Sequence, residues 1–276
     1  MRRGDPSWLG PAWQFCHSEG MHDHDADRPA SASTLPLTGE RTVPGIWHEN
    51  YWFRRHEAAY EALLPHLRGQ RVLEIGCGEG YGAALIATVA RRVIGLDYDE
   101  RTIEHAAATY PQAAFLRANL AALPVRESAF DAVASLQVIE HVWDHEHFLG
   151  ECARTLRPGG MLIVTTPNRL TFSPGPDAPA NPFHAHEFVA DELVGLVERC
   201  GVEVVDVLGL HAGGWLRALD AAHGGSFAGA QLAAPPQEWS AGLARDVAAV
   251  RTADFRVSGE RLDACLDLVV IARRPQ

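Results

Sequence analysis

Short apolar runs alternate with longer amphipathic stretches along most of the chain. The short runs predict strands, and the longer stretches, with apolar residues at helical spacing, predict helices between them. The predicted strands cover residues 72–75, 93–97, 114–118, 132–136, 161–165, 202–207 and 266–272. The predicted helices cover residues 50–67, 80–91, 100–110, 146–156 and 191–200. This alternation predicts an α/β fold whose mostly parallel sheet is covered by helices on both faces.

Four segments fall outside this alternation. Residues 1–34 are rich in Gly, Pro, Ser, Asp and His without periodicity, which predicts a disordered leader. Residues 35–69 predict an N-terminal helical cap on a single domain that runs from residue 35 to residue 276. Two insertions, residues 169–187 and the mostly helical residues 211–261, follow the fifth and sixth strands. Because ligands bind at the carboxyl ends of strands in such sheets, residues 169–187 are a candidate substrate lid.

The composition removes several classes of function. All 24 basic residues are arginine, so Schiff-base, P-loop and protein-kinase chemistry, which need lysine, are excluded. The net charge of −11 argues against nucleic acid as the main partner. Scattered cysteines without a C-x-x-C pair predict a reducing compartment. No long apolar run and no secretory signal are recognised, so we expect a cytoplasmic protein without a membrane span.

A glycine-rich turn follows the first predicted strand. Its chemistry-bearing residues are Glu74, Gly76, Gly78 and Gly80. Glycines let the backbone approach a ligand closely, and the following helix N-terminus offers free N–H groups. Asp97 ends the second strand, where a carboxylate can accept both hydroxyls of a ribose or, alternatively, cap a helix. A dinucleotide fingerprint needs glycine at position 81, which is Tyr81, so an NAD-dependent oxidoreductase is disfavoured.

The glycine turn and the acidic residue before it resemble the first motif of the class I S-adenosylmethionine-dependent methyltransferases. Matches to this family follow at Asn119, at Gln137 and at the turn of residues 157–160. The resemblance implies a three-layer, Rossmann-like α/β sheet of seven strands, mostly parallel with the last strand antiparallel. It implies S-adenosylmethionine as the cofactor and a small molecule or an oligosaccharide as the methyl acceptor. The implied cofactor-binding residues are Glu74, Gly76, Gly78, Gly80, Asp97, Asn119, Leu120 and Gln137.

The pair Glu140-His141 raises the question of a metal ion. Some ubiquinone-type O-methyltransferases carry Glu-x-x-Glu-His here and bind a divalent ion, but Gln137 stands where the first Glu would be. A neutral amide with two other ligands makes a poor site for a hard cation, so we expect no metal. A purely structural role at a helix start is the alternative to catalysis by His141.

Closer similarity lies outside the core. Residues 39–44, 49–56, 166–175 and 181–184 resemble the methyltransferases linked to 6-O-methylation of methylglucose lipopolysaccharide, an intracellular glucan. This implies a sugar hydroxyl of an intracellular polysaccharide as acceptor. A hydroxyl is a weak nucleophile that benefits from a general base, and we expect His184 first and His141 second in that role. The alternatives are a quinone-like or other small apolar acceptor, and a non-catalytic cofactor-binding module. The sequence leaves the oligomeric state open.

Overall fold

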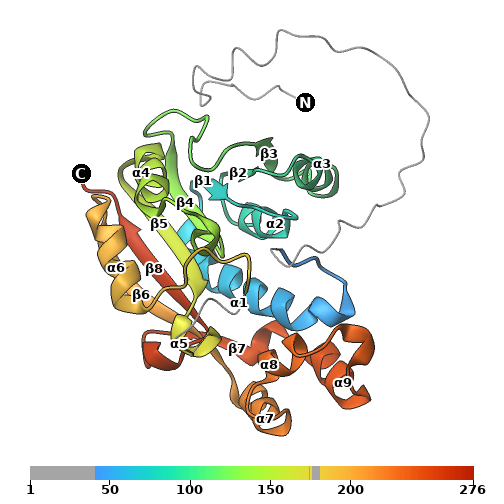
Figure 1. Ribbon diagram of the computed structural model, residues 1–276. Helices are drawn as coiled ribbons and strands as arrows, with labels where there is room; N and C mark the ends of the chain where they lie inside the picture. The colour runs from blue at the N-terminus through green and yellow to red at the C-terminus, as the bar shows by residue number, and fades with distance from the viewer. Residues whose placement is uncertain (1–40, 174, 176–180) are drawn as a thin grey trace, which may run out of the picture.

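The computed structural model describes residues 41–173, 175 and 181–276 and shows helices packed around a central sheet (Figure 1). Its strands are β1 (Arg71–Ile75), β2 (Arg92–Asp97), β3 (Ala114–Arg117), β4 (Phe130–Leu136), β5 (Leu156–Pro167), β6 (Glu203–Ala212), β7 (Phe255–Ser258) and β8 (Asp267–Arg273). Its α-helices are α1 (Asn50–Leu67), α2 (Tyr81–Ala87), α3 (Glu100–Thr109), α4 (His145–Thr155), α5 (Arg169–Phe172), α6 (Ala190–Arg199), α7 (Gly214–Ala222), α8 (Phe227–Leu232) and α9 (Ala241–Ala249). The expected disordered leader, residues 1–34, lies outside the described residues.

The sheet has the strand order β3-β2-β1-β4-β5-β8-β6-β7. Strands β1 to β5 pair in parallel; Val72 of β1, for example, lies opposite Val93 of β2 and Ala132 of β4. Strand β8 lies between β5 and β6 and is antiparallel to both. The prediction of a Rossmann-like, mostly parallel sheet with an antiparallel last strand is therefore confirmed. The described sheet has eight strands, however, and not seven.

Helices α1 and α2 cover one face of this sheet. Tyr60 and Leu63 of α1 and Ile86 of α2 share a buried cluster with Val72 and Val93 of the strands. Helices α4 and α6 belong to a separate cluster that contains the alternate residues of the same strands. Because side chains of a strand alternate between its two faces, the two clusters lie on opposite faces of the sheet, and both faces are covered. The strands are thus buried on both sides, as a parallel sheet requires.

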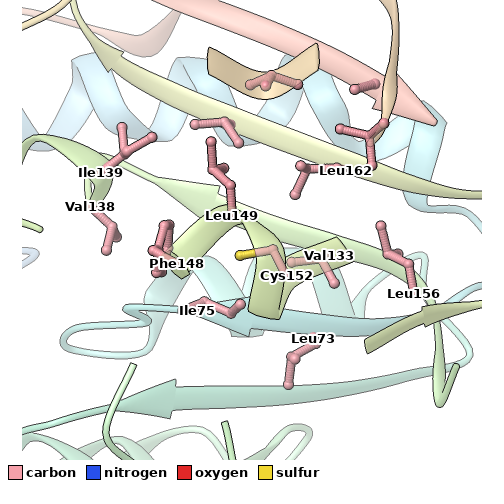
Figure 2. Packing of buried hydrophobic residues seen from close by; sticks show 14 of the residues in the cluster. Leu73, Ile75, Val133, Val138, Ile139, Phe148, Leu149, Cys152, Leu156 and Leu162 are labelled. Atoms are coloured by element: carbon pink, nitrogen blue, oxygen red, sulfur yellow. The ribbon is translucent and has the colours of Figure 1, made fainter. Parts of the chain in front are cut away.

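Helix α4 illustrates how the sequence produces this packing. Its first turn is capped by Asp144, whose carboxylate accepts from the His147 N–H at 3.0 Å. Phe148, Leu149 and Cys152 then fall on one face of the helix because their spacing matches the helical period. Figure 2 shows these three side chains among the apolar residues of the sheet, and all three are completely buried.

Strand β7 is the main difference from the sequence expectation. The sequence predicts mostly helix over residues 211–261, and α7, α8 and α9 do form there. Strand β6, however, extends to Ala212, and β7 pairs with it so that Leu210 lies opposite Val257. Four residues give too little periodicity to reveal a strand. Segment 255–258 is a strand because the open edge of β6 supplies its hydrogen bonds.

Two element boundaries also differ. Helix α2 ends at Ala87, four residues before the predicted end at residue 91, and the Thr88 hydroxyl donates to the Leu85 carbonyl at 2.6 Å where the helix stops. Strand β5 begins at Leu156, so the Arg-Pro-Gly-Gly turn lies within the strand, where Gly159 has a φ of +72°.

The second insertion is fixed against helix α1. The ring of Tyr51 in α1 lies 5.4 Å from the ring of Phe227 and 5.8 Å from that of Phe255, measured between centroids. Leu216 and Val247 belong to the same buried cluster. Helix α1 therefore packs against both the sheet and residues 211–261. None of the helices in the described ranges is long and apolar enough to span a membrane.

Candidate active site

The glycine turn after β1 adopts a backbone that only glycine accepts easily. Gly76, Gly78 and Gly80 have φ angles of +74°, +50° and +100°. A Cβ atom on Gly76 would lie 2.4 Å from Val138 Cγ2, and one on Gly80 would lie 2.8 Å from Ala106 Cβ. A Cβ on Gly78 would meet no described atom within 4 Å. Two of the glycines therefore permit close packing beneath the turn, and Gly78 leaves its own surface open for a ligand.

Asp97 holds this turn in place. Its carboxylate accepts from the N–H of Gly78 at 2.9 Å and from the N–H of Asp99 at 3.0 Å. The helix cap that was the alternative role belongs to Asp99, which accepts from the Thr102 N–H at 2.8 Å. Asp97 thus stands at the end of β2 beside the glycine turn, where the sequence predicts the ribose. The ribose contact itself stays a prediction.

Glu74 is completely buried beneath the glycine turn. Its Oε1 atom accepts from the Tyr60 hydroxyl at 2.6 Å, and Oε2 has no hydrogen-bond partner among the described residues. Burial raises the pKa of this carboxyl to about 8. The small cavity over the turn is lined by Tyr60 and not by Glu74. Glu74 therefore supports the turn from below through its hydrogen bond with Tyr60, and its contact with the cofactor stays a prediction.

Of the other predicted cofactor-binding residues, Gln137 lines the two cavities described below, and Asn119 and Leu120 do not. Asn119 is exposed and its side chain accepts from the Ala121 N–H at 3.0 Å. Leu120 is half-buried and packs against the core. Neither lines the two cavities described below, so their contact with an adenine ring stays a prediction. Gln137, in contrast, has a φ of +58° at the end of β4 and lines both cavities.

Two cavities meet above the carboxyl edge of the sheet. The smaller, of about 50 Å³, lies over the glycine turn, and the larger, of about 320 Å³, lies beside it. Four residues line both: Arg41, Thr42, His56 and Gln137. Ligand pockets usually measure about 300–1,000 Å³, so the larger cavity has the size of a ligand pocket and the one over the turn is smaller.

Three of the residues that line both cavities, Arg41, Thr42 and His56, were not recognised in the sequence as site residues. Thr42 lies 3.2 Å from the Tyr81 hydroxyl, oxygen to oxygen, and Arg41 contacts Asp99 at 3.4 Å. His56 of α1 is half-buried and lines both cavities, and burial lowers its pKa to about 4, so its ring is neutral at neutral pH. No local pattern marks this histidine, because it lies in an ordinary amphipathic helix and reaches the site only through tertiary packing.

Both insertions and helix α1 build the wall of the larger cavity. Its apolar lining residues are Trp52, Pro167, Phe172, Pro182, Phe183 and Leu232. Its other polar and charged lining residues are Glu49, Arg55, Glu140, His141, Asn181 and His184. The two predicted catalytic histidines therefore lie in one cavity, and the candidate lid segment contributes to its wall.

His184 is held by partners on both ring nitrogens. Its Nδ1 lies 2.9 Å from Glu187 Oε1, and its Nε2 lies 3.1 Å from Asn181 Nδ2. Because the Asn181 oxygen accepts from the Phe183 N–H at 3.0 Å, the Asn181 amide nitrogen donates to Nε2. The ring proton therefore sits on Nδ1 and is donated to Glu187. Burial lowers the pKa of His184, although Glu187 opposes this shift.

His141 and Glu140 lie next to His184. The His141 ring is 4.9 Å from the His184 ring, centroid to centroid, and its Nδ1 lies 3.0 Å from the Phe183 carbonyl oxygen. Glu140 is 1% exposed, and its Oε2 accepts from the Thr166 hydroxyl at 3.0 Å. Burial raises the pKa of Glu140 to about 8. Glu187 was missed in the sequence although it follows His184 by three residues, because nothing local shows that the two side chains face each other.

Comparison with known proteins identifies the kind of site. A family model described as a methyltransferase domain matches residues 73–164, which include the glycine turn, Asp97 and Gln137. A protein of Mycolicibacterium smegmatis named as an S-adenosylmethionine-dependent methyltransferase is 56% identical over 260 residues, which is 92% of this chain and 100% of that protein. A protein of Mycobacterium tuberculosis with the same kind of name is 50% identical over 270 residues, covering 94% and 96%.

Solved structures show the same fold. An S-adenosylmethionine-dependent methyltransferase from Mesorhizobium loti superposes with a TM-score of 0.52 at 21% identity, covering 80% of this chain and 98% of that one. The [4+2]-cyclase SpnF superposes with a TM-score of 0.53 at 20% identity, covering 79% and 81%. The two relatives from Mycolicibacterium smegmatis and Mycobacterium tuberculosis match nearly the whole chain at 50% identity or more and therefore show its family. This chain belongs to the class I S-adenosylmethionine-dependent methyltransferases, and S-adenosylmethionine is its cofactor.

Proposed function

We propose that this methyltransferase transfers the methyl group of S-adenosylmethionine to a hydroxyl group of a sugar in an intracellular polysaccharide. The observation that carries the proposal is the junction of the two cavities. The glycine turn lines the smaller one, and His184, oriented by Glu187, lines the larger one. An acceptor in the larger cavity would therefore meet the cofactor at the shared residues, with a histidine beside it.

The cofactor would be held by the glycine turn and by Asp97. Gly78 offers the open surface of the turn, and the carboxylate of Asp97 would accept the ribose hydroxyls. Gln137 lies between the two cavities, where the reacting methyl group would pass. The bound sulfonium supplies an electrophilic methyl group. The task of the surrounding residues is to align it with the acceptor oxygen, and good alignment is worth up to roughly 7–11 kcal/mol.

The transfer itself forms one bond and breaks one. The acceptor oxygen attacks the methyl carbon, the carbon–sulfur bond breaks, and its electron pair stays on the sulfur of S-adenosylhomocysteine. In the metal-free site the hydroxyl proton passes to Nε2 of His184, the nitrogen that accepts from Asn181 in the structure. The hydrogen bond to Glu187 holds the proton already present on Nδ1 and stabilises the imidazolium that forms. His141, next to this ring, is the second candidate.

The walls of the larger cavity support a sugar acceptor. The rings of Trp52 and Phe172 lie 6.3 Å apart, centroid to centroid, and offer apolar surfaces on which a sugar ring can pack. The carboxyl of Glu49 lines the same cavity and can accept hydrogen bonds from sugar hydroxyls. A site for a hydroxyl-rich molecule needs this combination of apolar faces and hydrogen-bonding groups.

An acceptor screen tests the proposal. The full chain is incubated with isotopically labelled S-adenosylmethionine and, separately, with gluco-oligosaccharides, quinols and simple phenols. We expect label on a gluco-oligosaccharide, located on its hydroxyl by mass spectrometry and NMR spectroscopy. Label on a quinol or phenol, with none on any saccharide, would contradict the sugar proposal.

One observation favours a second candidate, a small apolar acceptor of the quinone type. Six of the lining residues of the larger cavity are apolar, and several come from the two insertions. A ubiquinone biosynthesis O-methyltransferase of Rhizobium etli is 39% identical over 108 residues, although the match covers only 37% of this chain and 43% of that protein. The quinol arm of the screen decides between the two acceptors. Cofactor binding without methylation of any acceptor would favour the non-catalytic module instead.

Replacing Gly76 by alanine is expected to weaken cofactor binding at least tenfold. The φ of +74° strains an alanine, and its Cβ would collide with Val138 Cγ2, so the turn must shift. Gly69→Ala is the matched control because Gly69 has a φ of +71° but open space around it and does not line either cavity. Calorimetric titration with S-adenosylmethionine measures both variants. Equal affinities in the two variants would show that the turn tolerates the shift.

A further inference from the structure

We infer that Glu140, His141 and His184 form a binding site for one divalent transition-metal cation of the class of Zn²⁺, Mn²⁺ and Co²⁺. Each residue offers one ligand atom, and these atoms all lie within 4.8 Å of one another. Tetrahedral coordination at about 2.0–2.2 Å places ligand atoms roughly 3.4 Å apart, so modest side-chain movements would complete the site. The three residues lie in the wall of the larger cavity, so a cation held by them would be reached from that cavity.

Hydrogen bonds at Nδ1 make Nε2 the available ligand atom of both histidines. The Nδ1 atom of His141 is tied to the Phe183 carbonyl at 3.0 Å, and that of His184 is tied to the Glu187 carboxylate at 2.9 Å. Both rings therefore carry their proton on Nδ1 and leave the lone pair of Nε2 for a cation. A histidine that donates its other N–H to a carboxylate or a carbonyl is the usual arrangement behind a metal ligand. The Asn181 amide, which now donates to His184 Nε2, has to give way.

The charges around the cluster fit a cation. The Glu140 carboxyl is buried, and the neutral hydroxyl of Thr166 donates a hydrogen bond to it. The nearby guanidinium of Arg55 forms its ion pair with Asp267. A divalent cation would supply the positive charge that a buried carboxylate needs. Two imidazole nitrogens with one carboxylate oxygen suit borderline cations such as zinc, and not Mg²⁺ or Ca²⁺, which prefer oxygen ligands.

The expectation of no metal depended on Gln137 as the third ligand. In the structure the third ligand is His184, which the insertion of residues 169–187 brings back beside Glu140 and His141. The inference uses the proposed function for one point only, the role of the cation. A cation in this position would bind the acceptor hydroxyl and lower its pKa, so that the proton leaves to water before the oxygen attacks the methyl carbon. With the cation bound, His184 would be one of its ligands and would not accept the hydroxyl proton.

Cobalt binding tests the site without any acceptor. The metal-stripped full chain is titrated with Co²⁺, and the visible absorption of coordinated cobalt is followed in the wild type and in Glu140→Gln, His141→Ala and His184→Ala. The chain contains 14 histidines, so the difference between variants, and not total binding, is decisive. His66→Ala, which removes an exposed histidine of α1, is the control. We expect about one Co²⁺ per wild-type chain, unchanged in the control and weakened at least tenfold in each site variant.

Two further measurements separate this inference from the proposed function. Titration with S-adenosylmethionine shows whether each variant keeps the fold, because none of the three residues lines the cofactor cavity. Chelation should abolish methyl transfer by the wild type, and Zn²⁺ or Mn²⁺ should restore it. Cobalt binding that is equal in the site variants and the control overturns the metal site, while methylation of a saccharide without metal leaves the proposed function standing. Cobalt bound at the cluster with no saccharide methylated supports the site and contradicts the sugar acceptor.

Discussion

Asp267→Ala is expected to lower the free energy of unfolding by about 3–5 kcal/mol. Asp267 is 1% exposed and Arg55 is 3% exposed, and the two form a bidentate ion pair with nitrogen–oxygen distances of 2.7 and 2.6 Å. The same guanidinium donates to the Leu266 carbonyl at 2.8 Å. Burial alone lowers the pKa of Arg55, but Asp267 outweighs burial and raises it above its ordinary value. Removing the carboxylate therefore leaves a charged guanidinium buried without its partner.

Two variants make this prediction specific to a buried charge. In Arg55→Met with Asp267→Leu both charges are removed, and a well-packed apolar pair should recover most of the loss. Glu100→Ala breaks the exposed pair between Glu100 and Arg117 and should cost at most about 1 kcal/mol. Equilibrium unfolding in urea measures all of them. If Asp267→Ala proved as stable as Glu100→Ala, water or another residue would have to compensate the charge of the Arg55 guanidinium.

His184→Ala is expected to lower kcat by about 10²–10⁴-fold, the range for loss of a residue that activates a nucleophile. The affinity for S-adenosylmethionine should stay unchanged, because His184 lines the larger cavity and not the one over the glycine turn. The expectation holds whether the imidazole takes the proton directly or binds a cation, because both routes use Nε2. Glu187→Gln should cause a smaller fall in kcat, since glutamine can still accept the Nδ1–H bond but lacks the charge.

His186→Ala is the matched control for this prediction. His186 lies two residues after His184, but its side chain is 41% exposed and pairs with Glu192 at 2.7 Å. Steady-state kinetics with the acceptor found in the screen should show the control close to wild type. A His184→Ala enzyme that keeps kcat within threefold of wild type would move the activating role to His141 or His56, the other histidines of the cavity.

Local sequence patterns predicted most of the scaffold and proposed candidates for part of the site. The strand and helix alternation was confirmed because each element carries its own periodicity, as α4 does with Phe148, Leu149 and Cys152. The glycine turn and Asp97 could be proposed as cofactor-binding residues because they are close in sequence and their chemistry needs particular residue types. Their contacts with the cofactor stay predictions. The mostly helical second insertion was expected, but β7 within it was not, because hydrogen bonds to the distant strand β6 decide that segment.

The sequence by itself determined the α/β class, the glycine cradle and the exclusion of lysine chemistry, because these depend on local spacing and composition. Only the tertiary structure decided which side chains meet. It brought His56 of α1 to the same two cavities as Gln137, the residue after β4, and it returned His184 to Glu140 and His141. Such contacts arise from strand order and loop packing, which join residues far apart in the chain and leave no periodic signal between them.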